Sequence, residues 1–332
     1  MEKDAKRTTI YDLATLADAS PSAVSSVLNG TWKKRRISQK LADRIIRLAE
    51  EQGYAVNAPA SLLRRERSHI VGMIVPKYNN RYFGEISEQF EAMARARGFF
   101  PVVTCTQRDP ELEFEAAREL ISYQAECLIS TGATDPDRIS AFCAASGVQS
   151  INLDLPGRAA TSVISDNLAG AKDLTRLILD RCETDLGWRG PLRFVGGRRS
   201  DHNTAARLDG FLAAHRERAI AVPGSHIMAT GYSAEKAAAA LASVIPDGPT
   251  GLFVNSTISL EGVVRWYRAL TGGAKLVRYG CFDWDPFGSF LPGNVGMVEQ
   301  DVAAMLGTAF DLIGAPATPK QQILIPCMLR TF

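Results

Sequence analysis

The sequence predicts an all-α helix-turn-helix domain at the front of the chain, followed by an α/β core of two doubly wound parallel-sheet subdomains. In the first 53 residues, apolar positions recur at helical spacing. From residue 70 onward, short apolar runs alternate with longer amphipathic stretches, which is typical of parallel sheets with helices on both faces. At 332 residues the chain is long enough for two or three domains.

The first two helices are predicted from the stretch 8–30, TTIYDLATLADASPSAVSSVLNG. Its first half places four apolar residues on one helical face: Ile10, Leu13, Ala14 and Ala17. Ser20 followed by Pro21 is a helix start, because serine can cap an orphan N–H and proline has no N–H to lose. A second helix is therefore expected over 21–28. Its inward residues are Ala23, Val24, Val27 and Leu28, and its outward residues are Pro21, Ser22, Ser25 and Ser26.

Two features favour DNA reading by this stretch over a helical hairpin used only for packing. Small outward residues let a helix lie deep in a major groove. Four cations at 33–36 follow Asn29-Gly30, where a phosphate clamp is needed if the preceding helix occupies the groove. The DNA contacts predicted in this domain are Thr9, Tyr11, Ser20, Pro21, Ser22, Ser25, Ser26, Asn29, Lys33, Lys34, Arg35 and Arg36.

A third helix is expected from Ser38 to Gly53, which is a natural stop. Its apolar face holds Leu41, Ala42, Ile45, Leu48 and Ala49. Three helices close a small core, so the DNA-binding domain is predicted over 1–56. The next segment, 57–68, contains PASLLRRER, which is too short to form a stable helix alone in water. Such a segment folds only against a partner or on DNA.

Charge is distributed unevenly, although the net charge is only +2. Residues 1–67 hold 13 Lys and Arg against 8 Asp and Glu, whereas the remainder holds 25 against 28, so the basic end is the expected DNA end. No apolar stretch is long enough to span a membrane and no signal core is visible, so we expect a cytoplasmic protein without a membrane partner. The six scattered cysteines are expected as buried thiols rather than disulfides or metal ligands.

The core is predicted over 69–332. Its expected strands are 70–76, 99–105, 126–132, 149–154 and 162–166 in the first half, and 192–197, 219–231, 250–256, 276–283 and 296–301 in the second. Ligands of doubly wound sheets bind at the carboxyl ends of strands. Those ends carry amides, carboxylates and aromatic rings, which are the groups that hold polyols. They include Asn79, Asn80, Tyr82, Asp154, Arg198, Asn255 and Asp283.

The order of these motifs resembles the lactose/purine/fructose repressor (LacI/GalR) family of bacterial transcriptional regulators. The resemblance rests on YDLATLADASPSAVSSVLNG, then a helix, then GYAVNAPASLLRRERSHIVGMIVP, and the basic loop TWKKRRIS most resembles the fructose-repressor branch. It implies a periplasmic-binding-protein-like core and a homodimer, with a tetramer as the alternative, that binds a palindromic operator. It also implies that 57–68 is a hinge helix that pushes Leu63 into the minor groove. Asn57, Ser61 and Arg64 are the accompanying contacts, although the family often has arginine where this chain has Ser61.

The resemblance further implies a sugar or sugar-phosphate effector between two halves, 69–166 with 300–316 and 167–299 with 320–332. Arg207 in NTAARLDGF matches the arginine that grips the effector. Asp283 in YGCFDWD matches the aspartate that bonds hydroxyls, but one extra residue leaves Asp285 as the alternative. The early-loop contact matches Asn79 or Asn80, and the late position matches Glu299 or Gln300. The full expected set is Asn79, Asn80, Tyr82, Asp154, Arg198, Arg207, Asn255, Asp283 and Gln300.

Four cations near the strand ends bear on the effector class: Lys77, Arg81, Arg198 and Arg199. They slightly favour a phosphorylated or acidic metabolite, unless they point to solvent or pair with carboxylates. A sugar-binding receptor without a regulatory role is the alternative function, and the basic front end argues against it. The chain has no GxxxxGK, G-x-S-x-G or HExxH motif, and its four histidines lack metal-like spacing. We therefore expect no enzyme activity, no cofactor and no metal.

Overall fold

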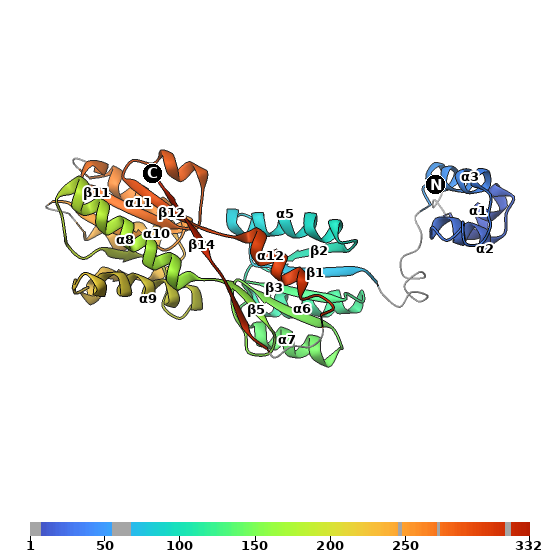
Figure 1. Ribbon diagram of the computed structural model, residues 1–332, viewed down its shortest axis with the longest axis horizontal. Helices are drawn as coiled ribbons and strands as arrows, with labels where there is room; N and C mark the ends of the chain where they lie inside the picture. Colours follow the sequence, from blue (N-terminus) through green and yellow to red (C-terminus); the bar gives the residue numbers. More distant parts are fainter. Residues whose placement is uncertain (1–7, 55–67, 245–247, 271–272, 316–319) are drawn as a thin grey trace, which may run out of the picture. The chain divides into compact units, whose positions relative to one another are not determined.

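The structure, a computed structural model, describes residues 8–54, 68–244, 248–270, 273–315 and 320–332. The chain divides into two compact units, Met1–Ser68 and His69–Phe332, and each is described by itself. The first unit contains α1 (Ile10–Ala17), α2 (Pro21–Leu28) and α3 (Gln39–Glu51) (Figure 1). The side chains of Thr9, Ser20 and Ser38 cap these helices, so the second and third helices begin where the sequence predicts. The predicted hinge residues Asn57, Ser61, Leu63 and Arg64 lie outside the described residues.

The three helices bury one small apolar core, which includes Leu13 of α1, Val24 of α2 and Ile45 of α3. The expectation that Ser26 faces outward is wrong, because this side chain is only 5% exposed. Its hydroxyl donates to the Ser22 carbonyl oxygen at 2.7 Å, which satisfies the buried group within the helix. A serine on the apolar side of α2 therefore does not reach a groove.

The second unit contains two six-stranded sheets, each covered by helices on both faces (Figure 1). The first sheet has the order β13-β5-β4-β3-β1-β2 and every pair in it is parallel. Its strands are β1 (Ile70–Val75), β2 (Phe100–Cys105), β3 (Cys127–Thr131), β4 (Gln149–Leu153), β5 (Ser162–Ser165) and β13 (Gln322–Ile325). The helices α5 (Arg81–Ala96) and α12 (Val302–Asp311) pack on one face, and α6 (Pro110–Ser122) and α7 (Pro136–Ala145) on the other.

The second sheet has the order β14-β12-β11-β10-β6-β8. Its strands are β6 (Arg193–Val195), β8 (Ile227–Met228), β10 (Thr250–Val254), β11 (Val277–Phe282), β12 (Asn294–Gln300) and β14 (Cys327–Thr331), of which β14 runs antiparallel to β12. The helices α8 (Asn167–Leu186) and α9 (His202–Glu217) cover one face. The helices α10 (Ala234–Ala242) and α11 (Thr257–Arg268) cover the other. The two doubly wound subdomains predicted from the sequence are confirmed.

Short elements complete the second subdomain. A two-stranded sheet pairs β7 (Gly197–Arg198) with β9 (Thr230–Gly231). The described part of this subdomain also contains three 3₁₀ turns, namely η1 (Gly224–His226), η2 (Gly273–Leu276) and η3 (Pro286–Phe290). The cysteines expected as buried thiols include four buried ones, whereas Cys105 and Cys327 are half-buried. None of the helices in the described ranges combines the length and apolar character needed to cross a membrane.

Within the described residues, the chain passes from one sheet to the other after β5, after β12 and after β13. The last passage corrects the assignment of 320–332 to the second subdomain, because residues 322–325 pair with 162–165 of the first sheet. Residues 323–329 form an apolar run that Pro326 divides, because proline has no N–H to donate to a neighbouring strand. Only the residues after it join the second sheet.

Candidate functional site

A cavity of about 120 Å³ lies between the two subdomains, where carboxyl ends of strands from both sheets meet. Its lining comes from both subdomains: Lys77, Asn80, Tyr82, Phe83, Arg108 and Asp154 from the first, and Arg198, Asn203, Arg207, Tyr232, Ser256, Ile258, Asp283 and Gln300 from the second. This position agrees with the rule that doubly wound sheets bind ligands beyond the ends of their strands.

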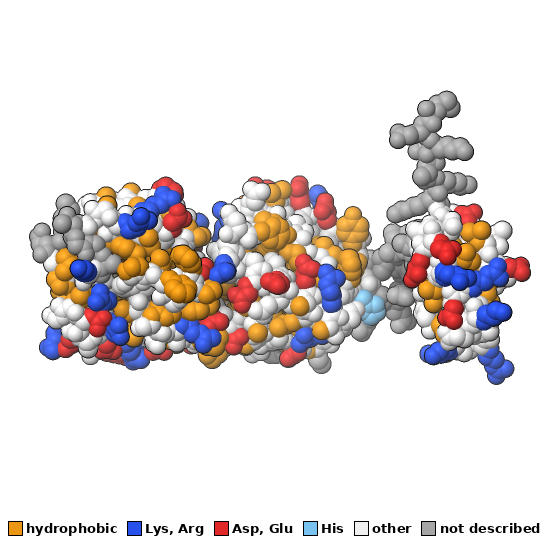
Figure 2. All heavy atoms as spheres, turned by 90° about the horizontal axis from the view of Figure 1, so that it is seen from above, with side chains coloured by type: hydrophobic (Ala, Val, Ile, Leu, Met, Phe, Trp, Pro, Cys, Tyr) orange, Lys and Arg blue, Asp and Glu red, His pale blue; other side chains and the backbone are white. Residues whose placement is uncertain are grey.

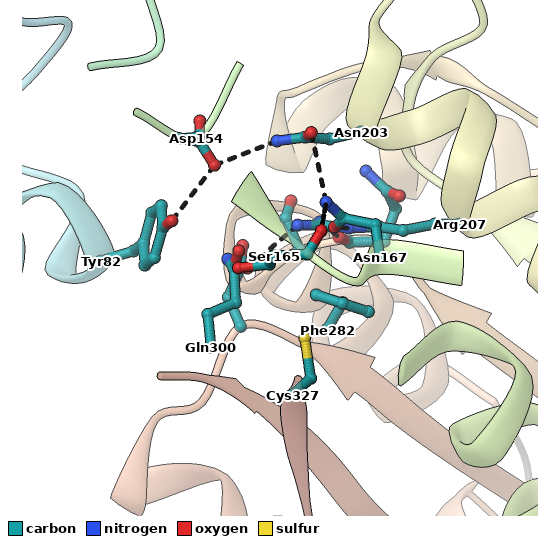
Figure 3. Close-up of polar contacts among 12 residues, drawn as sticks. Tyr82, Asp154, Ser165, Asn167, Asn203, Arg207, Phe282, Gln300 and Cys327 are labelled. Atoms are coloured by element: carbon teal, nitrogen blue, oxygen red, sulfur yellow. Dashed lines mark hydrogen bonds and ion pairs between the residues drawn. The ribbon is translucent and has the colours of Figure 1, made fainter. Parts of the chain in front are cut away.

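Arg207 of α9 lies at the centre of the polar network and is only 3% exposed (Figure 3). Its Nε donates to Asn167 Oδ1 at 2.7 Å, and its Nη1 donates to the Asn255 carbonyl oxygen at 2.7 Å. Its Nη2 lies 3.5 Å from Asp283 Oδ1. The guanidinium group also lies over the Phe282 ring, 3.7 Å from the centroid. Every guanidinium nitrogen therefore has an acceptor already, and Asp283 balances the charge.

Asp283, directly after β11, is the second member of this buried pair. Its Oδ1 accepts a hydrogen bond from Gln300 Nε2 at 2.7 Å, in addition to the Arg207 contact. Burial raises the pKa of Asp283, while Arg207 and Gln300 lower it. Gln300 Oε1 is buried without a hydrogen-bond partner among the described residues. An unpaired buried acceptor next to a carboxylate favours a ligand that brings donors.

Asp154, directly after β4, connects the two subdomains (Figure 3). Its Oδ1 accepts hydrogen bonds from Tyr82 Oη at 3.1 Å and from Asn203 Nδ2 at 3.0 Å. Asn203 Oδ1 in turn accepts from Asn167 Nδ2 at 3.2 Å, so the network continues to Arg207. Burial raises the pKa of Asp154, and it raises the pKa of Tyr82 well above its usual value. A ligand that contacts Asp154 therefore contacts a side chain whose hydrogen bonds join the two subdomains.

The cations expected near the effector are not equivalent. Lys77 and Arg198 line the cavity, and both residues are exposed. Arg198 lies over the Tyr232 ring, 5.7 Å from its centroid, with its Nε 3.9 Å from Asp201. Arg81 instead pairs with Asp285 at 3.0 Å, and Arg199 is exposed and outside the cavity lining. Half of the expected cations are therefore not in the lining.

The structure brings together seven of the nine expected effector residues: Asn80, Tyr82, Asp154, Arg198, Arg207, Asp283 and Gln300. Asn79 is exposed and does not line the cavity, because it precedes Asn80, which caps α5 and turns the chain into the helix. Asn255 is fully buried behind the lining, and it contributes its carbonyl oxygen to Arg207 rather than its side chain. Both expectations are corrected.

The two open alternatives have structural answers. Asp283 lines the cavity and Asp285 does not. Successive strand residues face opposite sides of a sheet, so Gln300 points to the cavity while Glu299 pairs with Arg330 at 2.5 Å.

Six lining residues stand outside the expected effector set and the expected cations: Phe83, Arg108, Asn203, Tyr232, Ser256 and Ile258. Arg108 follows β2, and Asn203 lies in the first turn of α9, which ends the loop after β6, so the strand-end rule could have found both. Tyr232 directly follows β9 and the end of the expected strand 219–231, so the same rule points to it as well.

The predicted DNA surface of the first unit is largely exposed. Pro21 and Ser22 on α2 are exposed, and Ser25 and Asn29 are half-buried. Tyr11 of α1 is 71% exposed. The hydroxyls of Thr9 and Ser20 instead accept hydrogen bonds as helix caps.

The four cations at 33–36 are exposed on a turn anchored by Trp32, which packs against the helical core. The Lys33 ammonium lies 5.4 Å from the centroid of the Trp32 ring. On the face of the second unit seen in Figure 2, cationic and acidic side chains are interspersed. The basic turn therefore remains the candidate phosphate contact.

Residues 71–287 match the sequence model of a protein family described as the periplasmic binding protein domain. The chain is 58% identical over 195 residues to the ribitol operon repressor of Klebsiella aerogenes, covering 59% of this chain and 72% of the relative. It is 27% identical over 339 residues to the sucrose operon repressor of Klebsiella pneumoniae, covering 96% of each. The catabolite repressor/activator of Escherichia coli (strain K12) is 29% identical over 126 residues, or 38% of each chain, so the sequences do not favour the fructose-repressor branch.

Solved structures agree with the fold. The lac repressor dimer bound to operator and the anti-inducer ONPF has a TM-score of 0.76 at 22% identity and covers 98% of each chain. A Pseudomonas putida Cra regulator in complex with fructose 1-phosphate has a TM-score of 0.68 at 21% identity, covering 79% of this chain and 98% of that one. The repressor relatives show that the chain is not an enzyme and belongs to the LacI/GalR family of DNA-binding transcriptional regulators.

Proposed function

We propose that this protein is a repressor that binds a palindromic operator as a homodimer, and that a neutral polyol or sugar in the cavity changes its operator affinity. The effector class is inferred from two buried carboxylates, those of Asp154 and Asp283. Each is bonded through Oδ1 to groups of the described chain, and no such bond is made by either Oδ2. Such carboxylate oxygens accept hydrogen bonds, and the hydroxyl groups of a polyol or sugar can donate them.

The charge balance argues against a phosphate next to Arg207. All three guanidinium nitrogens already have acceptors, and Asp283 neutralises the positive charge. A phosphate placed there would lie beside the carboxylates of Asp154 and Asp283, and like charges disfavour each other in a buried site. Arg207 is already paired, so the charge of the phosphate would have to be balanced by the outer cations of the lining, Lys77, Arg108 and Arg198. We therefore propose a neutral effector in place of the phosphorylated or acidic metabolite that the sequence slightly favours. The 58% identity to a ribitol operon repressor supports a polyol.

The operator contacts follow from the exposed surface of the first unit. We assign base reading to the outward side of α2, chiefly Ser22 and Ser25, and phosphate binding to the turn at 33–36. Ser26 is left out because it is buried. The role of 57–68 as a paired hinge helix with Leu63 at the minor groove is part of the proposal and is supported by the family alone.

The coupling between effector and operator uses the arrangement of the core. An effector that contacts Asp154 in the first subdomain and Asp283 in the second favours one angle between them. Because the chain crosses between the sheets beside the cavity, after β5 and after β12, that angle is set close to the ligand. Couplings of this kind are typically about 1–3 kcal/mol, or roughly 5- to 150-fold in affinity.

The proposal is tested with the full-length protein in two steps. Binding sequences are selected from random DNA, and a palindromic consensus is expected. Operator affinity is then measured by fluorescence anisotropy without ligand and with ribitol, xylitol, D-arabitol, D-ribose and ribitol 5-phosphate, each also titrated calorimetrically. We expect a neutral member of the panel to bind and to change operator affinity at least about 5-fold. Binding of the phosphate alone would refute the neutral effector, and an unsymmetrical consensus would refute the dimeric operator.

A further inference from the structure

An ion pair crosses from one subdomain to the other beside the cavity. Arg81 Nη1 lies 3.0 Å from Asp285 Oδ1. Arg81 is the first residue of α5, in the first subdomain, whereas Asp285 follows β11, in the second. The two residues are 204 positions apart in the sequence, so the pair depends on how the two subdomains lie against each other.

Both members of the pair are direct or near neighbours of cavity residues in the sequence. Asn80 and Tyr82, which flank Arg81, line the cavity, and Asp283, two residues before Asp285, also lines it. A ligand that draws Tyr82 and Asp283 toward itself therefore moves the same two backbone segments that carry the ion pair. Neither Arg81 nor Asp285 lines the cavity, so the pair acts on the shape of the cleft and not on the ligand itself.

The backbone holds the Asp285 side chain close to the paired geometry, and a helix cap fixes the point from which the Arg81 side chain extends. Asp285 Oδ1 also accepts a hydrogen bond from the Phe287 backbone N–H at 2.8 Å, which caps η3. Asn80 Oδ1 accepts from the Tyr82 N–H at 3.0 Å and so fixes the start of α5 at Arg81. Such anchoring reduces the conformational entropy lost when the pair forms.

Arg81 has a second carboxylate within reach when the cleft opens. Glu85 lies one turn further along α5, and the Arg81 charge lowers its pKa against a larger upward shift from burial. Residues at this spacing are neighbours on a helix surface. Loss of the Asp285 contact would therefore leave Arg81 with a carboxylate of its own helix as a neighbour.

We propose that Arg81 and Asp285 form a clip across the cleft that favours the arrangement able to hold the effector. They are positioning residues for the ligand site, and the clip operates whether or not the cavity is occupied. Only the ligand-binding part of this inference rests on the proposed function. An exposed ion pair of this kind corresponds to a bias of about 1.5- to 5-fold in the closed population.

The test compares hydrogen exchange of the full-length protein without ligand in wild type, R81A, D285N and the double variant. D285N keeps an oxygen that can cap η3 but loses the charge. The matched control is R95A, which removes the Arg95–Glu91 pair at 2.7 Å within the same helix. We expect exchange to rise about 1.5- to 5-fold in the cleft segments 77–84, 198–204 and 283–288 in both single variants and not in R95A. The double variant should resemble the single ones, because the two groups act as one pair.

Unchanged exchange in R81A, an equal rise in R95A, or additive effects in the double variant would each overturn the clip. Ribitol is then titrated into the same variants, with the other members of the panel as alternatives. A clip predicts a Kd about 1.5- to 5-fold weaker in R81A and D285N than in R95A. If no compound binds any variant, the proposed effector class fails, while the exchange result still decides the clip.

Discussion

At the scale of single residues, the charged group at the centre of the cavity is Arg207, and it is already paired with a carboxylate of the protein. Arg207 has a hydrogen-bond acceptor at each nitrogen and an aromatic ring against its face. Asp283 supplies the balancing charge. Breaking such a buried pair is costly because the remaining group stays charged and unpaired.

Replacing Arg207 with alanine should therefore lower the free energy of unfolding by about 3–5 kcal/mol. The double variant R207A/D283N should lose less than R207A alone, since it leaves no buried charge behind. Denaturant unfolding of the purified variants measures both values. A double variant destabilised by the sum of the single effects would show that the two groups are not coupled. Operator binding by the folded fraction should persist in R207A, whereas the ligand response should be lost.

The family resemblance pointed to Arg207 through its motif, whereas one extra residue in the second motif left Asp283 and Asp285 as alternatives, of which only Asp283 lines the cavity. It could not locate Asn203 in the same way. The bond from Asn203 to Asp154 joins residues 49 positions apart and exists only because the two subdomains meet at the cleft. The same reason explains Asn255, whose place at a strand end did not reveal that its side chain points behind the lining.

At the scale of elements, the packing of α9 on the second sheet includes a buried histidine. His215 is fully buried, with Nδ1 2.8 Å from the Phe211 carbonyl oxygen and Nε2 accepting from the Leu192 N–H at 3.1 Å. The imidazole is therefore assigned as neutral, with the proton on Nδ1. Burial lowers the pKa of His215 from its ordinary value of 6.5.

This histidine predicts a loss of stability in mild acid. Above pH 6.5 both folded and unfolded forms are neutral and the group contributes nothing. Below that pH the unfolded chain binds a proton that the folded form resists, so the free energy of unfolding falls by up to about 1.4 kcal/mol per pH unit. Urea unfolding between pH 7.5 and 5 should show a shallower decline for H215Q than for wild type. Equal slopes would mean that another group controls the effect.

Helix starts were readable from the sequence because the signal is local. Ser20-Pro21 and Ser38 carry their own capping groups, and the helices begin beside them. The final strands were not readable, because residues 323–329 form one continuous apolar run. Its division between two sheets depends on Pro326 and on partners at distant positions of the sequence.

At the scale of the whole core, both sheets are completed by the same short segment. β13 adds to β5 at the edge of the first sheet, and β14 adds to β12 at the edge of the second. Without β14, the backbone donors and acceptors of β12 on that side would face solvent. An exposed strand edge is a template for pairing with other chains.

Truncation after Pro326 should therefore promote self-association of the core. Light scattering at increasing protein concentration is expected to show aggregates in the truncated form and none in the full-length protein. A synthetic peptide with the sequence of residues 326–332 should suppress them by pairing with β12. The control peptide carries proline in place of Leu329, since proline lacks the N–H that an edge strand donates. Suppression by both peptides alike would indicate a cause other than the open edge.

The late position of these strands also has a consequence for synthesis. A ribosome adds roughly 5–20 residues per second, so β5 at 162–165 waits roughly 10–30 seconds before β13 at 322–325 has been made. During that interval the nascent first subdomain carries an unpaired strand edge in a crowded cell. The core can reach its final form only after translation has passed residue 331.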